Sequence, residues 1–187
     1  MTAPDRQRRR RVDARHNSER VLSAAIEVFT EHGLEATIPE VAARAGVGKA
    51  TVYRSYPTKA DLVRELALLH LDWFAELAAA ALEAARTDAY RALEGLLERV
   101  AARLAEDRLM VEVLSGVDGI EDERLDRQLT QMVALAREQG RLRQDATAMD
   151  VQVLVAGVAR ALIGLEIRDP AVWRRYARLA LAALRPD

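Results

Sequence analysis

The sequence contains no cysteine and only three histidines among its 187 residues. The absence of cysteine excludes disulfides and cysteine-based zinc sites, and it is compatible with a reducing compartment. The longest unbroken apolar run, residues 153–159, is far too short to span a bilayer. The amino terminus is rich in arginine and has no apolar signal core, so we expect a cytoplasmic protein without a membrane partner.

The chain also has almost no net charge, with a formal value of −1. Such a balance argues against a nucleic-acid partner for the chain as a whole, but the charge is unevenly distributed. Residues 1–62 carry 11 basic against 8 acidic side chains, whereas the remainder carries 17 against 21. The two lysines, Lys49 and Lys59, both lie in the net-positive part. A positively charged amino-terminal domain is therefore expected.

Residues 37–62, TIPEVAARAGVGKATVYRSYPTKADL, have the pattern of two short helices joined by a tight turn. Thr37 and Glu40 have the spacing of a capping box, which predicts that a helix starts there. Gly46 stands where the chain must leave that helix through a left-handed turn. Pro57 ends the second helix because its ring prevents continuation. This pattern is typical of a DNA-binding helix-turn-helix.

The string AGVGKATVYRSYPTKADL resembles the amino-terminal domain of the TetR family of ligand-responsive transcriptional repressors. The resemblance covers roughly residues 17–64, and it is specific because many positions agree at fixed spacing. It implies a dimeric regulator whose amino-terminal domain binds DNA and whose carboxy-terminal domain binds an effector. The residues that carry it are Ala45, Gly46, Val47, Thr51, Val52, Tyr53, Tyr56 and Lys59, with Ala25, Phe29, Gly33, Thr37 and Ala42 upstream.

Two positions depart from the usual family pattern. Gly48 replaces a capping serine, which removes one hydrogen bond to the helix or to a phosphate. Tyr56 replaces the commoner phenylalanine. Neither change alters the expected fold, although both bear on which bases are read.

The predicted DNA contacts fall into three groups. Some face outward from the second helix of the motif, as the family's base contacts do. Others stand at helix amino termini, where backbone donors and positive charge suit a phosphate. Two arginines are placed to reach the backbone or a guanine edge. For any single polar residue the alternative is simple surface solvation. The set is Thr37, Arg44, Lys49, Thr51, Tyr53, Arg54 and Lys59.

No segment shows the alternation of a strand, so we predict an all-α protein. Residues 1–16 form a basic arm with six arginines and no apolar periodicity, for which we expect disorder. This arm either follows DNA phosphates and the minor groove or is a solvated tail. Residues 17–64 form the DNA-binding domain and residues 65–187 a helical effector-binding and dimerisation domain. Within the latter, a break in a long helix is expected at residues 86–88.

Helix position and residue type suggest the wall of an effector pocket, although ordinary core packing is the alternative for each residue. The candidates are Trp73, Phe74, Leu77, Leu97, Met110, Leu114, Met132 and Leu135, with Tyr90, His70 and Glu112 as polar anchors. An acidic stretch, residues 121–123, is favoured as a solvated loop over a metal site. We predict neither a metal nor a cofactor.

The last two predicted helices carry surplus apolar surface. Small residues recur along the first of them, and two adjacent apolar stripes run along the second, one for the monomer core and one for a partner. The alternative is that both stripes serve the core. Resemblance implies that this surface forms the homodimer. Its residues are Gly157, Ala161, Gly164, Val172, Tyr176, Leu179 and Ala183.

Together these features predict a homodimeric repressor that binds a pseudo-palindromic operator and is released by a small, largely apolar effector. A transcriptional activator and a ligand-independent regulator are the nearest alternatives. A helical carrier or an enzyme is remote, because the sequence has no HExxH motif, nucleophile elbow or glycine-rich phosphate loop.

Overall fold

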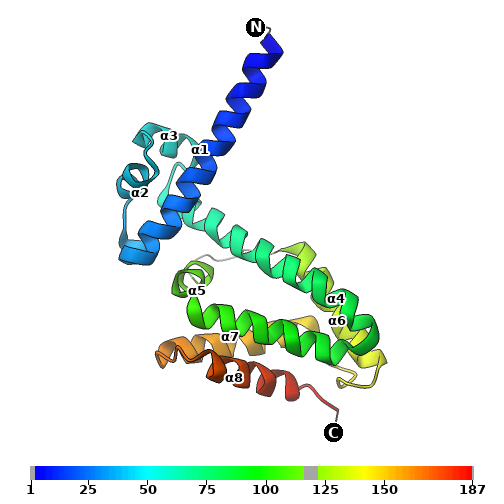
Figure 1. The fold of residues 1–187 in the computed structure, drawn as a ribbon. Coiled ribbons are helices and arrows are strands. Elements are labelled where there is room, and N and C mark those ends of the chain that lie inside the picture. Colours follow the sequence, from blue (N-terminus) through cyan, green and yellow to red (C-terminus); the bar gives the residue numbers. More distant parts are fainter. Residues whose placement is uncertain (1–2, 116–121, 187) are drawn as a thin grey trace. The chain divides into compact units, whose positions relative to one another are not determined.

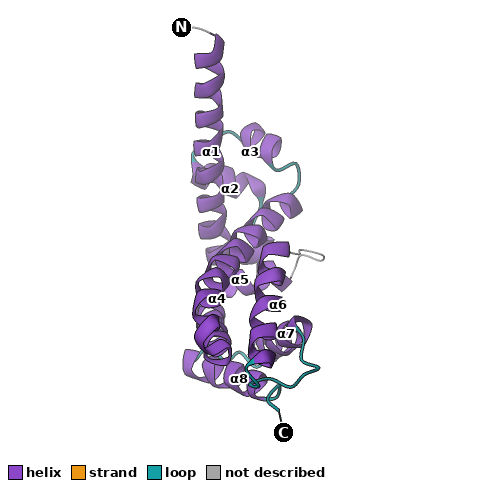
Figure 2. Ribbon diagram, turned by 90° about the vertical axis from the view of Figure 1, so that its right-hand side faces the viewer, coloured by secondary structure: helices purple, strands orange, loops and turns teal. Residues whose placement is uncertain are grey.

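The computed structural model describes the backbone of residues 3–115 and 122–186 and the side chains of residues 16–114 and 122–186. These ranges contain helices and no strand, as the sequence predicts (Figure 2). Gly116, Gly119 and Glu121, which belong to the expected acidic loop and its borders, lie outside the described residues. The elements are α1 (Ala3–His32), the 3-10 turn η1 (Gly33–Glu35), α2 (Ile38–Ala45), α3 (Lys49–Ser55), α4 (Lys59–Glu106), α5 (Arg108–Ser115), α6 (Glu123–Glu138), α7 (Ala148–Gly164) and α8 (Pro170–Ala182).

The chain divides into two compact units. The first contains α1, α2, α3, the start of α4 as far as Leu68, and α5 from Leu109. The second contains α4 from Leu69, together with α6, α7 and α8. The sequence suggested a boundary after residue 64, whereas contacts place the division within α4 and put α5 in the first unit.

The core of the first unit is formed where α2 packs against α1 and α3 packs against α2 (Figure 1). Val21, Ala25, Val28 and Phe29 project from one face of α1 and are almost completely buried. Their spacing of three and four residues is that of a single helical stripe, which explains why one helix can cover the back of the motif.

The amino terminus differs from the expected disordered arm, because α1 begins at Ala3 rather than near Asn17. Arginine and glutamine are good helix formers, and no glycine or proline follows Pro4 within this segment. Pro4 itself lies in the first turn, where the missing N–H group has no helical partner to lose. Lack of apolar periodicity therefore indicated an unburied segment and not an unstructured one.

Helix α4 contains the predicted break, at Asp88, whose φ of −147° and ψ of 92° are not helical. A carboxylate oxygen of Asp88 accepts a hydrogen bond from the Arg91 N–H at 3.0 Å and so caps the second half of the helix. The side chain of Gln139 enters the gap in the helical hydrogen bonding. Its Nε2 donates to the Ala85 carbonyl at 3.1 Å, and its Oε1 accepts from the Ala89 N–H at 2.8 Å. The amide thereby replaces the bond that Ala89 would otherwise make to Ala85.

The core of the second unit draws on both halves of α4 and on α6, α7 and α8. Helices α7 and α8 lie side by side (Figure 1). The stripe of Trp173, Ala177 and Ala180 on α8, continued by Leu184 after the helix, is buried, with exposed fractions between 2 and 7 %. The adjacent stripe is largely solvent-exposed in the single chain, which is described below.

Helices α7 and α8 each begin at a side-chain cap. Thr147 donates its hydroxyl to Asp150 at 2.7 Å, and the Asp150 N–H donates back to the Thr147 hydroxyl at 3.2 Å. The hydroxyl of Thr147 and then its backbone N–H, which donates to the same carboxylate at 2.8 Å, lower the pKa of Asp150. Asp169 caps α8 through the Ala171 N–H at 2.8 Å, with Pro170 in the first turn. Across the described residues, no helix has the length and apolar character that a bilayer crossing requires.

Candidate nucleic-acid interface

The first helix of the motif, α2, starts at a capping box. Glu40 accepts hydrogen bonds from both the backbone N–H and the hydroxyl of Thr37, each at 2.6 Å. The hydroxyl and then the N–H of Thr37 lower the pKa of the Glu40 carboxyl. The predicted start is confirmed, and the Thr37 hydroxyl is already engaged in the free protein.

The turn after α2 is held from α1. Gly46 has a φ of +64°, the left-handed conformation that its place in the sequence predicts. The Arg20 guanidinium donates to the carbonyls of Ala45, at 2.5 Å, and Gly46, at 3.4 Å. The conformation favours glycine. A Cβ on Gly46 would also lie 2.9 Å from the Arg20 guanidinium, which would have to move and would weaken its hydrogen bonds to the turn. Arg20 was not singled out in the sequence, because a helix capped by a residue 25 positions earlier has no local signal.

The second helix of the motif, α3, has one buried and one open side. Val52 is fully buried. Tyr53, the next residue, is 45 % exposed, and Lys49 and Arg54 are also exposed. Thr51 is half-buried. The open side of α3 therefore presents an aromatic ring, a hydroxyl and two cations, the groups that contact base edges and phosphates in a major groove.

Tyr56 closes α3 from the buried side. Only 7 % of its surface is exposed, and its hydroxyl lies 2.9 Å from the Ser18 hydroxyl of α1. Burial raises the pKa of the Tyr56 phenol. This hydrogen bond explains the tyrosine at a position where the family usually has phenylalanine.

The start of α4 brings a further cation to the same segment. Thr58 and Asp61 form a helix cap, with the Thr58 N–H 2.8 Å from the carboxylate and the hydroxyl 2.7 Å from it. The Thr58 hydroxyl is the main reason why the pKa of Asp61 is lowered. Lys59, half-buried, is the first residue of α4. Its charge and the free N–H groups of the first turn suit a phosphate oxygen.

Arg44 has partners that the sequence did not indicate. Its guanidinium contacts Glu31 of α1 at 2.6 Å and Glu27 of the same helix at 3.1 Å. The paired carboxylates raise the pKa of Arg44, and the Arg44 hydrogen bond lowers that of Glu31. In the free protein the charge of Arg44 is thus compensated, and the side chain joins α2 to α1.

Comparison with known proteins bears on this geometry directly. Residues 21–66, which contain all of α2 and α3, match the sequence profile of the family described as bacterial regulatory proteins, tetR family. Residues 21–66 are thus similar to the amino-terminal domain of TetR-family regulators. Members of this family are DNA-binding transcriptional regulators and not enzymes.

Individual TetR-family proteins show the same similarity. The HTH-type transcriptional repressor LfrR of Mycolicibacterium smegmatis is 46 % identical over 55 residues, which cover 29 % of this chain and 29 % of LfrR. A crystal structure of a TetR regulator from Mycobacterium vanbaalenii is 28 % identical, with a TM-score of 0.59, and covers 94 % of this chain and 99 % of the other. The fold also matches SmeT in complex with triclosan, at 24 % identity and a TM-score of 0.65, over 92 % of this chain and 93 % of that one. SmeT is the repressor of a multidrug efflux pump of Stenotrophomonas maltophilia.

The expected effector-pocket residues of the chain separate into two sets. Leu97 and Met132 lie in the core of the second unit, and Leu77 and Leu135 pack against it. Phe74 is buried, and the ring of its neighbour Trp73 meets it edge-on at 5.3 Å between centroids. The remaining two candidates, Met110 and Leu114, lie on α5, which belongs to the first unit.

One of the expected polar anchors has a notable environment. His70 is half-buried, and its Nε2 has no hydrogen-bond partner among the described residues. Burial lowers its pKa, against the opposing effect of the Asp107 carboxylate. Tyr90 instead lies beneath the Arg185 guanidinium. In the ranges that the structure covers, no group of three or more histidine, aspartate or glutamate side chains is placed to hold a metal ion.

The candidate dimer surface is open in the single chain. Leu179 is 51 % exposed and Tyr176 37 % exposed on α8, and Val172 is half-buried. On α7, Met149 and Val153 are each more than 60 % exposed, although neither was included in the predicted set. The other predicted interface residues are likewise exposed and are Gly157, Ala161, Gly164 and Ala183.

Proposed function

We propose that this chain is a transcriptional repressor that binds a pseudo-palindromic operator as a homodimer and is released by a small, largely apolar effector. The observation that carries the proposal is the two-sided helix α3, with Val52 fully buried and Tyr53 45 % exposed. A recognition helix needs this arrangement, because the buried side fixes its orientation while the open side reads the groove.

Within this proposal the contacts divide by chemistry. Lys49, Thr51 and Tyr53 meet bases or the adjacent phosphates, and Arg54 reaches the backbone or a guanine edge. Thr37 and Lys59 position the motif through phosphates at the starts of α2 and α4. Arg44 would have to break its ion pairs with Glu27 and Glu31 to reach DNA, so it contributes less to DNA binding than its formal charge suggests.

The proposed dimer is supported by the uncovered apolar side chains of α7 and α8. Leu179 and Val153, exposed by 51 and 61 %, represent surface that a second copy would remove from water. The glycines and alanine along α7 allow a facing helix to approach closely. A twofold dimer places its two recognition helices about 34 to 36 Å apart, one turn of DNA, which is why the operator is expected to be a pseudo-palindrome.

Effector release is supported by the apolar side chains that meet in the second unit, Leu77, Leu97, Met132 and Leu135. SmeT, which shares the fold, is known in complex with triclosan. A ligand held among such side chains regulates DNA binding only through unequal affinity for the two states of the protein. We therefore propose that the effector favours a conformation in which the two heads no longer match the operator spacing.

Selection of random duplexes on the purified full-length protein, followed by binding assays on the recovered sequence, tests the proposed function. We expect an enriched pseudo-palindrome bound by the dimer. Replacing Tyr53 and Lys59 together by alanine should weaken binding by about 100-fold or more, because a base contact and a phosphate contact are both lost. Arg99→Ala, an exposed change in the second unit, is the matched control and should bind as the wild type does. Unchanged binding by the double variant at the same salt would show that α3 is not the reading helix.

A further inference from the structure

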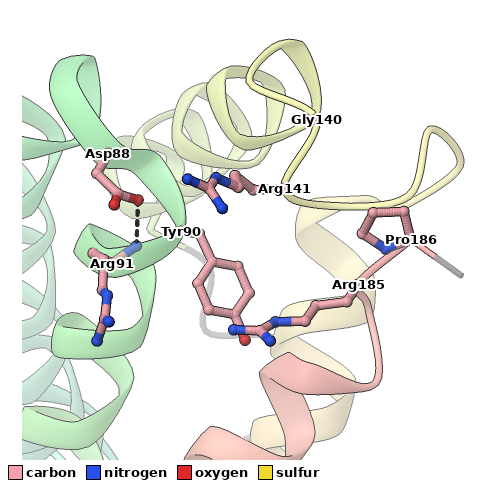
Figure 3. A pocket seen from close by; sticks show the side chains of 7 residues that line it. All are labelled: Asp88, Tyr90, Arg91, Gly140, Arg141, Arg185 and Pro186. Carbon is pink, nitrogen blue, oxygen red and sulfur yellow. Dashed lines mark hydrogen bonds between the residues drawn. The ribbon is translucent and has the colours of Figure 1, made fainter.

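A pocket of 370 Å³ lies in the second unit, at the kink of α4 (Figure 3). Three separate segments line it. Asp88, Tyr90 and Arg91 come from the kink and the second half of α4. Gly140 and Arg141 come from the turn that follows α6, and Arg185 with Pro186 from the chain after α8. Of these residues, the predicted effector pocket includes Tyr90 alone, as one of its expected polar anchors.

The walls of this pocket are fixed to one another. Gln139, at the end of α6, bonds the backbone on both sides of the kink at Asp88. The Arg143 N–H donates to the Leu184 carbonyl at 2.9 Å and so joins the turn after α6 to the end of α8. Gly140, with a φ of +67°, allows the tight reversal between these two bonds. The pocket is therefore held in shape before any ligand arrives.

The charge of the pocket is strongly unbalanced, with three guanidinium groups against one carboxylate. Arg91 is paired with Glu94 at 3.2 Å, and Asp88 already accepts the Arg91 N–H. No carboxylate within residues 16–114 and 122–186 forms an ion pair with Arg141 or Arg185. Two cations thus line the pocket without an ion-pair partner among the described residues.

One of these two cations is also held in place. The Arg185 guanidinium lies over the Tyr90 ring, 4.5 Å from its centroid, and Tyr90 itself is 5 % exposed. A cation–π contact with a buried ring restricts the guanidinium plane while leaving its N–H donors free. In Figure 3 the Tyr90 ring lies between the guanidinium groups of Arg141 and Arg185, whereas that of Arg91 points away. Arg141 and Arg185 both line the pocket, and the planar donors of a guanidinium suit an oxyanion.

We propose that this pocket binds a small molecule through an oxyanion, either a phosphate or a carboxylate group, held by Arg141 and Arg185. Its volume of 370 Å³ is in the range of small-molecule sites, and its concave shape suits a compact ligand. The Tyr90 ring contributes an apolar wall beside the charged group. This site is separate from the operator surface and from the proposed apolar effector, and it does not depend on either.

Isothermal titration calorimetry on the full-length chain tests the proposal, with inorganic phosphate and citrate as probes and chloride as the control at constant ionic strength. We expect saturable binding of at least one probe, with a dissociation constant on the order of 1 mM or tighter. The probe that binds identifies whether the site prefers phosphate or carboxylate. Chloride should show no saturation, because it cannot accept two parallel hydrogen bonds from a guanidinium.

The variants Arg141→Gln and Arg185→Gln, made singly, should each weaken binding of that probe by about tenfold or more, since a charge-assisted bond is lost. Arg99→Gln carries the same charge change on an exposed site of the second half of α4, and it should bind as the wild type does. Equal weakening by all three variants would indicate a general charge effect and would overturn the site. Failure of both probes to saturate the wild type at about ten times the expected constant would also overturn it.

Discussion

The Tyr56 hydroxyl at the end of α3 lies 2.9 Å from the Ser18 hydroxyl of α1. The two residues are 38 positions apart, and their hydrogen bond joins the recognition helix to the helix that supports it. A hydroxyl introduced at a buried position is unfavourable unless it finds a partner. The Ser18 hydroxyl therefore provides the hydrogen-bond partner that the buried Tyr56 hydroxyl needs.

Tyr56→Phe and Ser18→Ala should each lower the free energy of unfolding by about 1 kcal/mol, the usual contribution of a neutral hydrogen bond. The double variant should lose less than the sum, because removing one partner already breaks the bond. Urea unfolding followed by far-UV circular dichroism measures all three. Tyr53→Phe, on the exposed side of α3, is the control and should leave the stability unchanged. Additive losses would contradict the coupling.

Gly46→Ala should be more harmful than Gly140→Ala. Both glycines have a positive φ, so each change costs about 1 to 2 kcal/mol of backbone strain. At Gly46 the new Cβ would also lie 2.9 Å from the Arg20 guanidinium, whereas at Gly140 nothing lies within 4 Å. Thermal unfolding of the two variants should show the larger loss for Gly46→Ala. Equal losses of stability in the two variants would mean that the Arg20 guanidinium moves aside at no cost in free energy.

Lys59→Ala and Arg44→Ala remove one positive charge each from the same domain, but they should differ in DNA binding. Losing Lys59 should lower the slope of log affinity against log salt by about one unit, as expected for one phosphate contact. Losing Arg44 should change the slope much less, because Glu27 and Glu31 already compensate its charge. Operator binding at several salt concentrations distinguishes the two. A full unit lost with Arg44→Ala would show that this ion pair opens on DNA.

Gln139→Leu should destabilise the second unit by about 1 to 2 kcal/mol. The substitution removes an amide that satisfies the Ala85 carbonyl and the Ala89 N–H at the kink. Hydrogen exchange of the Ala89 amide should accelerate in the variant, since its acceptor is lost. Gln131→Leu, an exposed change on the same helix, is the control and should leave that amide protected. Unchanged protection in Gln139→Leu would contradict the role of the inserted amide.

Leu179→Glu should convert the proposed dimer into monomers at micromolar concentrations, because it buries a charge without a partner in the interface. Sedimentation equilibrium gives the assembly state, and circular dichroism checks that the monomer remains folded. Ala84→Glu introduces the same charge at an exposed position of α4 and should remain dimeric. A Leu179→Glu variant that stays dimeric would place the interface elsewhere.

Local signals predicted the helices of this protein well. The Thr37, Thr58 and Thr147 caps, the left-handed Gly46 and the break at Asp88 follow from residues close together in sequence. The two apolar stripes of α8 were also predicted from helical spacing, which assigns Trp173 to one stripe and Tyr176 to the other. The structure buries Trp173 and exposes Tyr176.

The contacts between distant segments could not be predicted in this way. Arg20 at the Gly46 turn, Gln139 in the α4 kink and Glu31 beside Arg44 depend on how helices pack, and helical spacing says nothing about which neighbour a polar side chain meets. The arginine pocket at Tyr90 belongs to the same class, because its three arginines come from three separate segments. The amino-terminal helix was missed for a different reason, since an unburied helix leaves no apolar pattern to detect.

The contacts that α1 makes determine how much of the chain must be transferred if the helix-turn-helix is grafted onto another protein. Ser18 and Arg20 hold the end of α3 and the turn after α2, so a chimera that transplants only residues 37–58 leaves both anchors behind. In the recipient protein, the proposed DNA-contacting side chains of α3 would then have a different orientation. A graft that begins before Ser18 and continues through the buried Leu66 keeps the contacts that orient α3. We therefore expect it to keep the operator preference of the donor protein.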